Sequence, residues 1–166
     1  MNLPRVAIVG RPNVGKSSLL NRFVGRRVSI VEPTAGVTRD RLSVTMTWRD
    51  RTFELIDTGG LGLVDEAQLK EHIESQIDVA LQAADVILFV VDGKEGFVPG
   101  DQMVAQRLRR MDCPVVLVAN KVESRWDEHA LHEWIKLGFG EPMATSATEG
   151  VGITDLLDAA VSRLPE

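Results

Sequence analysis

The chain has 166 residues, of which 44% are hydrophobic, and its formal net charge is −5. This length predicts one domain with a sizeable core and is too short for two ordinary domains. The acidic balance argues against nonspecific nucleic-acid binding through the whole surface, and the single cysteine excludes an internal disulfide. The longest apolar run, residues 86–91, is far below the ~20 residues of a spanning helix, and no secretion signal opens the chain. We expect a cytoplasmic protein with no membrane partner.

A glycine-rich motif, G-R-P-N-V-G-K-S, lies between a predicted strand, Val6–Val9, and a predicted helix over residues 18–23. In this setting the two glycines let backbone N–H groups point at anionic oxygens, and the helix N-terminus adds positive charge. Lys16 is predicted to reach the β- and γ-phosphates, and the Ser17 hydroxyl to ligate Mg²⁺. The residues predicted to line this phosphate site are Gly10, Arg11, Pro12, Asn13, Val14, Gly15, Lys16, Ser17 and Ser18.

The next predicted elements form an antiparallel hairpin. Leu42–Trp48 alternates with period two, and Asp50-Arg51 turns the chain into a strand over residues 53–56. Asp57 ends that strand, where a carboxylate can serve as a Mg²⁺ partner. Gly60 can bring its N–H close to the γ-phosphate because no side chain blocks it.

Two later segments favour guanine as the base. Asn120 and Lys121 follow a predicted strand, Val115–Ala119, and precede Glu123, whose carboxylate can accept two N–H donors from one edge of guanine. The Lys121 stem can lie along the base. Ser146 and Ala147 follow a short predicted strand over residues 143–145 and offer a backbone N–H to the guanine oxygen. We therefore expect GTP or GDP as the ligand, since adenine presents a different donor and acceptor pattern.

Strand and helix patterns alternate along the chain. Apolar stripes at helical spacing occupy residues 69–81 and 153–164, and a further strand is predicted over residues 86–91. This order predicts an α/β P-loop NTPase G domain, with a mostly parallel central sheet, one antiparallel edge strand and helices on both faces. Segments 28–40 and 58–68 are predicted to sense the γ-phosphate. Arg22, Arg26 and Arg27 are interpreted as a solvated helix end rather than an RNA contact.

The chain resembles the first G domain of the bacterial Der (EngA) double GTPases over nearly its whole length. The residues that carry the resemblance are Gly10–Ser18, Gly36–Arg41, Asp57–Leu61, Asn120-Lys121 and the run Leu137–Pro142 that leads to Ser146-Ala147. The resemblance implies a GTPase that assembles the large ribosomal subunit and binds its RNA, within a protein of two tandem G domains and a KH-like domain. Residues 1–166 hold one phosphate motif, so we expect a single, isolated first G domain that is monomeric.

Several positions bear on how such a domain would work. The resemblance makes Thr38 a candidate ligand of Mg²⁺ and of the γ-phosphate. Glu123 stands where most of the superfamily has Asp, which leaves the strength of guanine preference open, and Ala35 stands where the family more often has Pro, which leaves its loop less constrained. Arg39 is interpreted as a loop ion pair.

Hydrolysis is expected to be slow and potassium-stimulated. Leu61 occupies the place of a glutamine that orients water in many GTPases. Asn13, with phosphate oxygens and carbonyls of residues 31–37, can cage K⁺, or it can merely shape the turn. The predicted catalytic residues are Asn13, Lys16, Thr38 and Gly60.

Two alternatives stay open. One is the G domain of a tRNA-modification (MnmE-like) GTPase, against which the Leu137–Pro142 run counts. The other is a nucleotide-binding module with negligible turnover, which only a turnover assay separates from the first interpretation.

Overall fold

The computed structural model describes residues 3–11, 14–24, 28–29, 42–57, 71, 74, 77–78, 80, 84–122 and 128–165. Over these residues the chain forms a seven-stranded sheet with the order β2-β3-β4-β1-β5-β6-β7. The strands are β1 (Arg5–Val9), β2 (Val28–Ser29), β3 (Leu42–Trp48), β4 (Arg51–Asp57), β5 (Val86–Asp92), β6 (Val115–Asn120) and β7 (Met143–Ala144). The helices are α1 (Lys16–Val24), α3 (Pro99–Leu108), α4 (Glu128–Ile135) and α5 (Ile153–Ser162).

The sheet is parallel except at β3. β1 pairs in parallel with β4 and β5, and β5, β6 and β7 continue in the same direction. β3 pairs antiparallel with β4, as the predicted hairpin requires. The turn is Arg49-Asp50, one residue before the predicted Asp50-Arg51, and φ values of 50° and 66° suit a tight two-residue connection. The short strand β2 pairs antiparallel with β3 at the edge of the sheet, at the start of the segment 28–40, for which the sequence predicts no strand.

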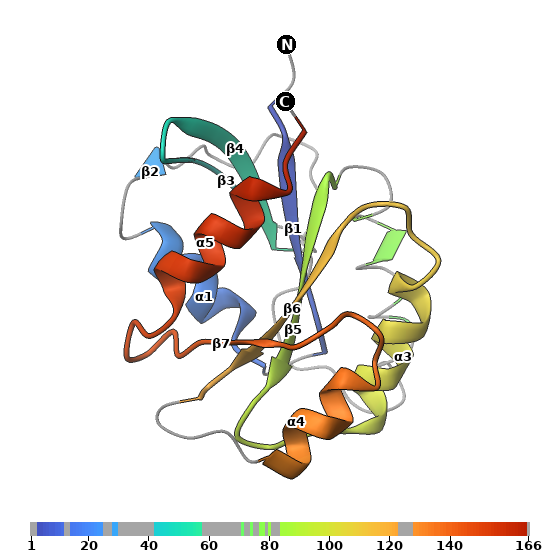
Figure 1. The fold of residues 1–166 in the computed structure, drawn as a ribbon. Helices are drawn as coiled ribbons and strands as arrows, with labels where there is room; N and C mark the ends of the chain where they lie inside the picture. The colour runs from blue at the N-terminus through green and yellow to red at the C-terminus, as the bar shows by residue number, and fades with distance from the viewer. Residues whose placement is uncertain are drawn as a thin grey trace.

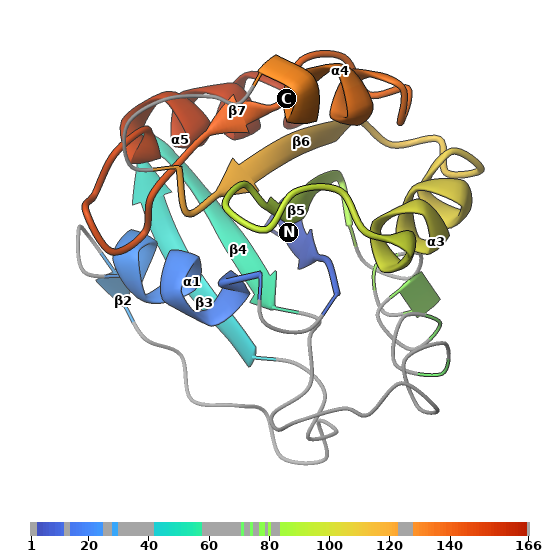
Figure 2. The same ribbon diagram turned by 90° about the horizontal axis from the view of Figure 1, so that it is seen from below.

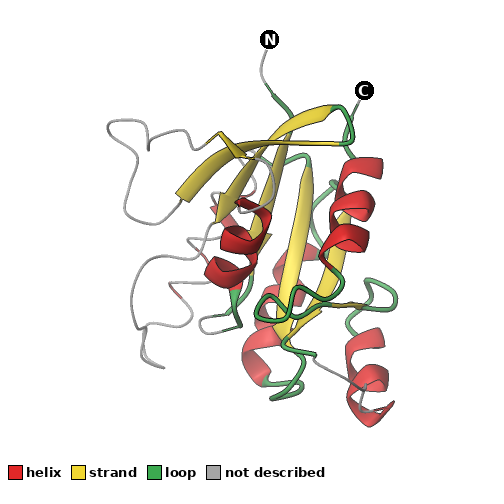
Figure 3. Ribbon diagram, turned by 90° about the vertical axis from the view of Figure 1, so that its left-hand side faces the viewer, coloured by secondary structure: helices red, strands yellow, loops and turns green. Residues whose placement is uncertain are grey.

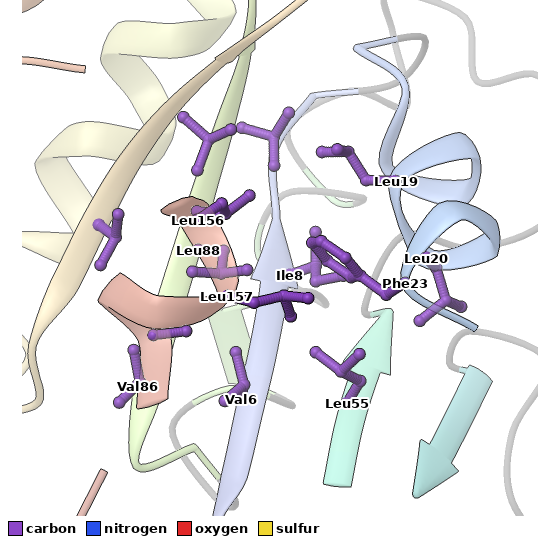
Figure 4. Packing of buried hydrophobic residues seen from close by; sticks show 14 of the residues in the cluster. Val6, Ile8, Leu19, Leu20, Phe23, Leu55, Val86, Leu88, Leu156 and Leu157 are labelled. Carbon is purple, nitrogen blue, oxygen red and sulfur yellow. The ribbon is translucent and has the colours of Figure 1, made fainter. Parts of the chain in front are cut away.

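Helices cover both faces of the sheet, which gives two cores. In Figure 1, α1 and α5 lie on one side of β1, β5 and β6, and α3 and α4 lie on the other. Alternate residues of β1 belong to the two cores. Val6 and Ile8 pack with α1 and α5, whereas Ala7 and Val9 pack on the opposite face. Figure 4 shows side chains of α1 and α5, including Phe23, directed at β1. Burial on both faces explains why these strands are apolar throughout rather than alternating.

This architecture places the carboxyl ends of four strands at one end of the sheet. Figure 2 looks onto that end, where β1 leads into α1. The two ends of the described chain lie at the opposite end (Figures 1 and 3). Among the described residues there is no helix with the length and apolar character needed to cross a bilayer.

Candidate functional site

Of the four adjacent strands β4, β1, β5 and β6, three end in a polar residue and β1 is followed by a glycine. Asp57, Asp92 and Asn120 are the last residues of β4, β5 and β6, and Gly10 comes directly after β1. Asp57 pairs in register with Ile8 of β1, and Asp92 pairs with Asn120. In parallel sheets ligands bind outside such carboxyl ends. The structure thus brings together residues that lie far apart in the sequence.

Both glycines of the phosphate motif are required by close contacts. A Cβ atom on Gly10 would lie 2.5 Å from the carbonyl oxygen of Val90. Gly15 has a φ of +97°, and a Cβ atom there would lie 2.2 Å from Nδ2 of Asn120. Any side chain at Gly15 would therefore meet both backbone strain and a clash with a buried amide.

The Lys16 side chain lies within the glycine loop and is only 7% exposed. Its Nζ donates to the carbonyl oxygens of Gly10, at 2.6 Å, and Arg11, at 3.0 Å. Burial lowers the pKa of the Lys16 ammonium from 10.5 to about 8, against the opposing effect of the Asp57 charge and with the help of the Arg11 charge. At neutral pH the ammonium is still protonated, so a full positive charge sits in the loop.

Asn120 joins the glycine loop to the segment predicted to read the base. Its side chain is buried, and Nδ2 donates to the carbonyl oxygen of Val14 at 3.0 Å. Oδ1 accepts hydrogen bonds from Oγ1 of Thr145 at 3.1 Å and from the backbone N–H of Ala147 at 3.2 Å. One side chain therefore fixes the relative position of the two loops.

Asp92 holds both a tight turn and Lys121. Its Oδ1 accepts the backbone N–H groups of Lys94 and Glu95, each at 2.9 Å, and its Oδ2 accepts Nζ of Lys121 at 2.9 Å. Burial raises the pKa of the Asp92 carboxyl, but these hydrogen bonds outweigh it and keep the pKa below its ordinary value. Lys121 itself has a φ of 66°, so its backbone adopts a left-handed conformation.

Arg11 reaches from the glycine loop to the start of α3. Its Nη2 lies 3.0 Å from Glu95 Oε2, and its Nε lies 3.3 Å from Asp101 Oδ1. Asp101 is buried and also accepts the backbone N–H of Val98 at 3.1 Å. Burial raises the pKa of Asp101 to about 6, although the Val98 hydrogen bond and the Arg11 charge oppose it. The guanidinium of Arg11 is thus engaged by two carboxylates beside α3.

Asp57 fits the metal role that the sequence predicts for it. Its carboxylate is 4% exposed at the end of β4, and its charge acts on the buried Lys16 ammonium. In nucleotide sites Mg²⁺ is usually bound by one or two protein carboxylates together with phosphate oxygens and water. In the described part of the chain no cluster of three or more His, Cys, Asp or Glu side chains could hold a metal ion by itself.

Of the remaining predicted site residues, some are described by their burial and the others lie outside the described residues. Ser146 and Ala147 are buried at the start of the loop before α5, and Ser18 is exposed on α1. Pro12, Asn13, Thr38, Gly60, Glu123 and the side chain of Ser17 lie outside the described residues.

Three acidic residues of this site are not among those predicted from the sequence. Asp92 ends an apolar strand just as Asp57 does, and that pattern would have found it. Glu95 and Asp101 carry no such signal, because their partner, Arg11, is remote in the sequence.

Comparisons with known proteins agree with this geometry. A family model described as 50S ribosome-binding GTPase matches residues 5–121. GTPase Der of Streptococcus pneumoniae (strain Hungary19A-6) is 49% identical over 165 residues, which cover 99% of this chain and 38% of that protein. The chain therefore spans well under half the length of the curated relatives it matches.

Solved structures of Era are similar over the whole chain. Era in complex with MgGDPNP and nucleotides 1506–1542 of 16S ribosomal RNA has a TM-score of 0.77 and 32% identity, covering 100% of this chain and 58% of that one. An Aquifex aeolicus Era variant bound to GDP.AlF4- has a TM-score of 0.76 and 33% identity, with the same coverage.

These features define a P-loop GTPase domain: a glycine loop follows β1, polar residues end β4, β5 and β6, and the fold is similar to that of Era. The predicted fold class is thus confirmed. More specifically, the family model matches more than half of the chain, so the chain belongs to the family described as 50S ribosome-binding GTPase. Its resemblance to the Der GTPases is confirmed by the relatives of that name.

Proposed function

We propose that this chain binds GTP with Mg²⁺, hydrolyses it to GDP and phosphate, and serves as a switch domain in large ribosomal subunit assembly. The hydrogen bonds of Asn120 carry the proposal. Its buried amide joins the loop predicted to hold phosphates to the loop predicted to read guanine. Residues 1–166 act as one GTP-binding domain in this proposal, and its cytoplasmic location stays a prediction.

Lys16 would supply the main charge for phosphate binding. Its ammonium donates to two neutral carbonyls, and the anionic oxygens of a triphosphate are stronger acceptors than either. α1 begins at Lys16, so the partial positive charge of the helix N-terminus faces the same site. The surroundings are buried, where charge interactions are weakly screened.

Ser17, Thr38 and Asp57 would hold Mg²⁺, which when bound neutralises charge between the β- and γ-phosphates. The Gly60 N–H would approach the γ-phosphate, so that segments 28–40 and 58–68 respond to its presence. The buried carboxylate of Asp57 beside Lys16 supports this assignment.

Guanine would be read by three groups. The Glu123 carboxylate would accept two N–H donors of the base, and the Lys121 stem would lie along its face. The loop that begins at Ser146 would donate a backbone N–H to the 6-oxo group. The salt bridge from Asp92 to Lys121 supports this arrangement, since it holds the lysine at the end of β6.

The ribosomal role rests on relatives. The family is described as 50S ribosome-binding GTPase, which points to the large subunit. Era was solved with a segment of 16S ribosomal RNA, which belongs to the small subunit and so supports contact with ribosomal RNA in general. On that basis we propose the large ribosomal subunit and its RNA as partners of the whole protein.

Phosphate release measured with GTP and with ATP, each with and without Mg²⁺, tests the proposal. We expect Mg²⁺-dependent release from GTP, far slower release from ATP, and loss of turnover in Lys16→Ala. Lys136→Ala is a matched control, because Lys136 is an exposed lysine that pairs with Glu133 on the surface. Equal rates with ATP would contradict guanine preference, and tight GTP binding without turnover would favour a plain binding module.

A further inference from the structure

The side chain of Arg22, on α1, holds the loop between β7 and α5. Its Nε donates to the carbonyl oxygen of Ala147 at 2.7 Å, and its Nη2 donates to that of Thr148 at 2.7 Å. Figures 1 and 2 show this loop passing beside α1. The interpretation of Arg22 as part of a solvated helix end is therefore wrong, because the guanidinium has two specific backbone partners.

The loop that Arg22 contacts is itself closed. Ser146 and Val151 exchange two backbone hydrogen bonds, at 3.0 and 3.1 Å, and the Ser146 hydroxyl accepts the N–H of Glu149 at 3.2 Å. Gly150 has a φ of +74°, and a Cβ atom there would lie 3.5 Å from the guanidinium carbon of Arg22. The turn thus passes close to the guanidinium that its carbonyl groups bind.

Ala147 is held from two directions. Its N–H donates to Asn120 Oδ1 at the end of β6, while its carbonyl accepts from Arg22 on α1. Peptide units are planar and trans, so anchoring the Ala147 carbonyl also fixes the direction of the Thr148 N–H. The orientation of the Ala147 and Thr148 N–H groups therefore depends on the side chains of Asn120 and Arg22.

We propose that Arg22 is a positioning residue for recognition of the 6-oxo group of guanine. The inference rests on the proposed guanine-nucleotide function and adds a residue that acts through the loop rather than on the base. The planar guanidinium can bridge two carbonyls at once, whereas a lysine ammonium is a point charge without that fixed fork. Arg22 also links α1, which starts at Lys16, with the loop between β7 and α5, called the base loop from here on. The same side chain therefore connects the helix of the proposed phosphate site to the loop of the proposed base site.

The test compares the dissociation constants of GDP, of IDP, which lacks the 2-amino group, and of 6-thio-GDP, which differs only at the 6-position. In Arg22→Gln we expect GDP binding to weaken about 3- to 10-fold, the range for a lost hydrogen bond. IDP should weaken by the same factor and 6-thio-GDP by less. The preference for GDP over 6-thio-GDP should therefore shrink, while the preference for GDP over IDP stays unchanged. Arg22→Lys should recover part of the loss.

Arg109→Gln is the matched control, because Arg109 also donates to a backbone carbonyl, that of Leu137 at 2.9 Å, outside the base loop. Its preferences should equal those of the native chain, and thermal unfolding should show that every variant is folded. Equal weakening of all three nucleotides in Arg22→Gln, or no weakening, would overturn the role of Arg22. A native chain that binds ADP as tightly as GDP would instead overturn the proposed function.

Discussion

Lys16 donates to backbone carbonyls of the loop in which it is predicted to meet phosphate. Its lowered pKa, about 8, makes the proton on this side chain sensitive to pH in the range where the chain can be assayed. A bound anion favours the charged form, so the pKa of Lys16 rises in the complex. Nucleotide affinity and the protonation of this one residue are thereby coupled.

We predict that GDP affinity is highest below pH 8 and falls, by up to about tenfold per pH unit, as pH rises through 8 to 9. Above pH 8 the free chain must take up a proton on Lys16 before it binds. Equilibrium titrations from pH 7 to 9 check this, and Lys16→Met should bind weakly with a flatter profile. The same slope in that variant would assign the titration to another group.

The contribution of Lys16 to folding stability changes with pH in the direction opposite to GDP affinity. Between about 8 and the ordinary value of 10.5 the unfolded chain binds the proton more tightly than the folded chain does. Stability rises with pH wherever the unfolded state holds more protons. The contribution of Lys16 to the free energy of unfolding should therefore increase across that window while GDP affinity declines.

A further prediction at the residue scale concerns Asn13. If its side-chain oxygen helps to cage a monovalent cation at the phosphates, fixed positive charge speeds hydrolysis. GTP hydrolysis should be faster in KCl than in NaCl at equal ionic strength, and Asn13→Ala should remove the difference. The measurement is phosphate release at saturating GTP. Equal rates in the two salts would leave Asn13 with a role in the turn alone.

At the scale of elements, two carboxylates lie on different elements and hold different parts of the molecule. Asp92 ends β5 and binds Lys121 at the site. Asp158, on α5, accepts Nε1 of Trp48 at 2.7 Å and pairs with Arg49 at the tip of the β3–β4 hairpin. One contact supports the site, and the other fastens a helix to the hairpin.

We predict that Asp92→Asn weakens GDP binding about 3- to 10-fold, since it keeps an acceptor for the turn but loses the charge that holds Lys121. Asp158→Asn should leave GDP binding unchanged and lower the urea midpoint of unfolding instead. GDP titration and urea unfolding on both variants give the comparison. A similar effect of both substitutions on affinity would show that Asp92 acts only through general stability.

The strands could be predicted from the sequence because both faces of the sheet are covered. Val86–Asp92 and Val115–Asn120 are apolar runs that stop at a polar residue, and the structure ends each strand there. The helix α3 could not be predicted from an apolar stripe in the same way. Its buried face includes Gly100 and Asp101, so no apolar stripe marks it.

The site could be predicted only in part, for a related reason. Motif spacing indicates that Lys16 and Asn120 face a nucleotide, because strand ends meet at one end of a parallel sheet. The partners of Arg11 and Arg22, a carboxylate side chain and a backbone carbonyl, lie 84 and 126 positions away, and no local pattern encodes them.

At the scale of the whole molecule, β1 lies at the centre of the sheet, between β4 and β5. Both neighbours come much later in the chain: the backbone N–H of Arg5 already bonds to Asp85, 80 positions away. Contacts of such long range slow folding, because a large loop must close before they form.

The hydrogen bond from Asn120 to Val14 extends this dependence to the glycine loop, since it spans 106 positions. During synthesis the N-terminal residues emerge first, so the complete phosphate motif leaves the ribosome long before the side chain that shapes it. A nascent chain shorter than 120 residues therefore carries the whole motif without Asn120 to hold it. We expect nucleotide to bind only after β6 has joined the sheet, which makes GTP a ligand of the finished domain rather than a template for its folding.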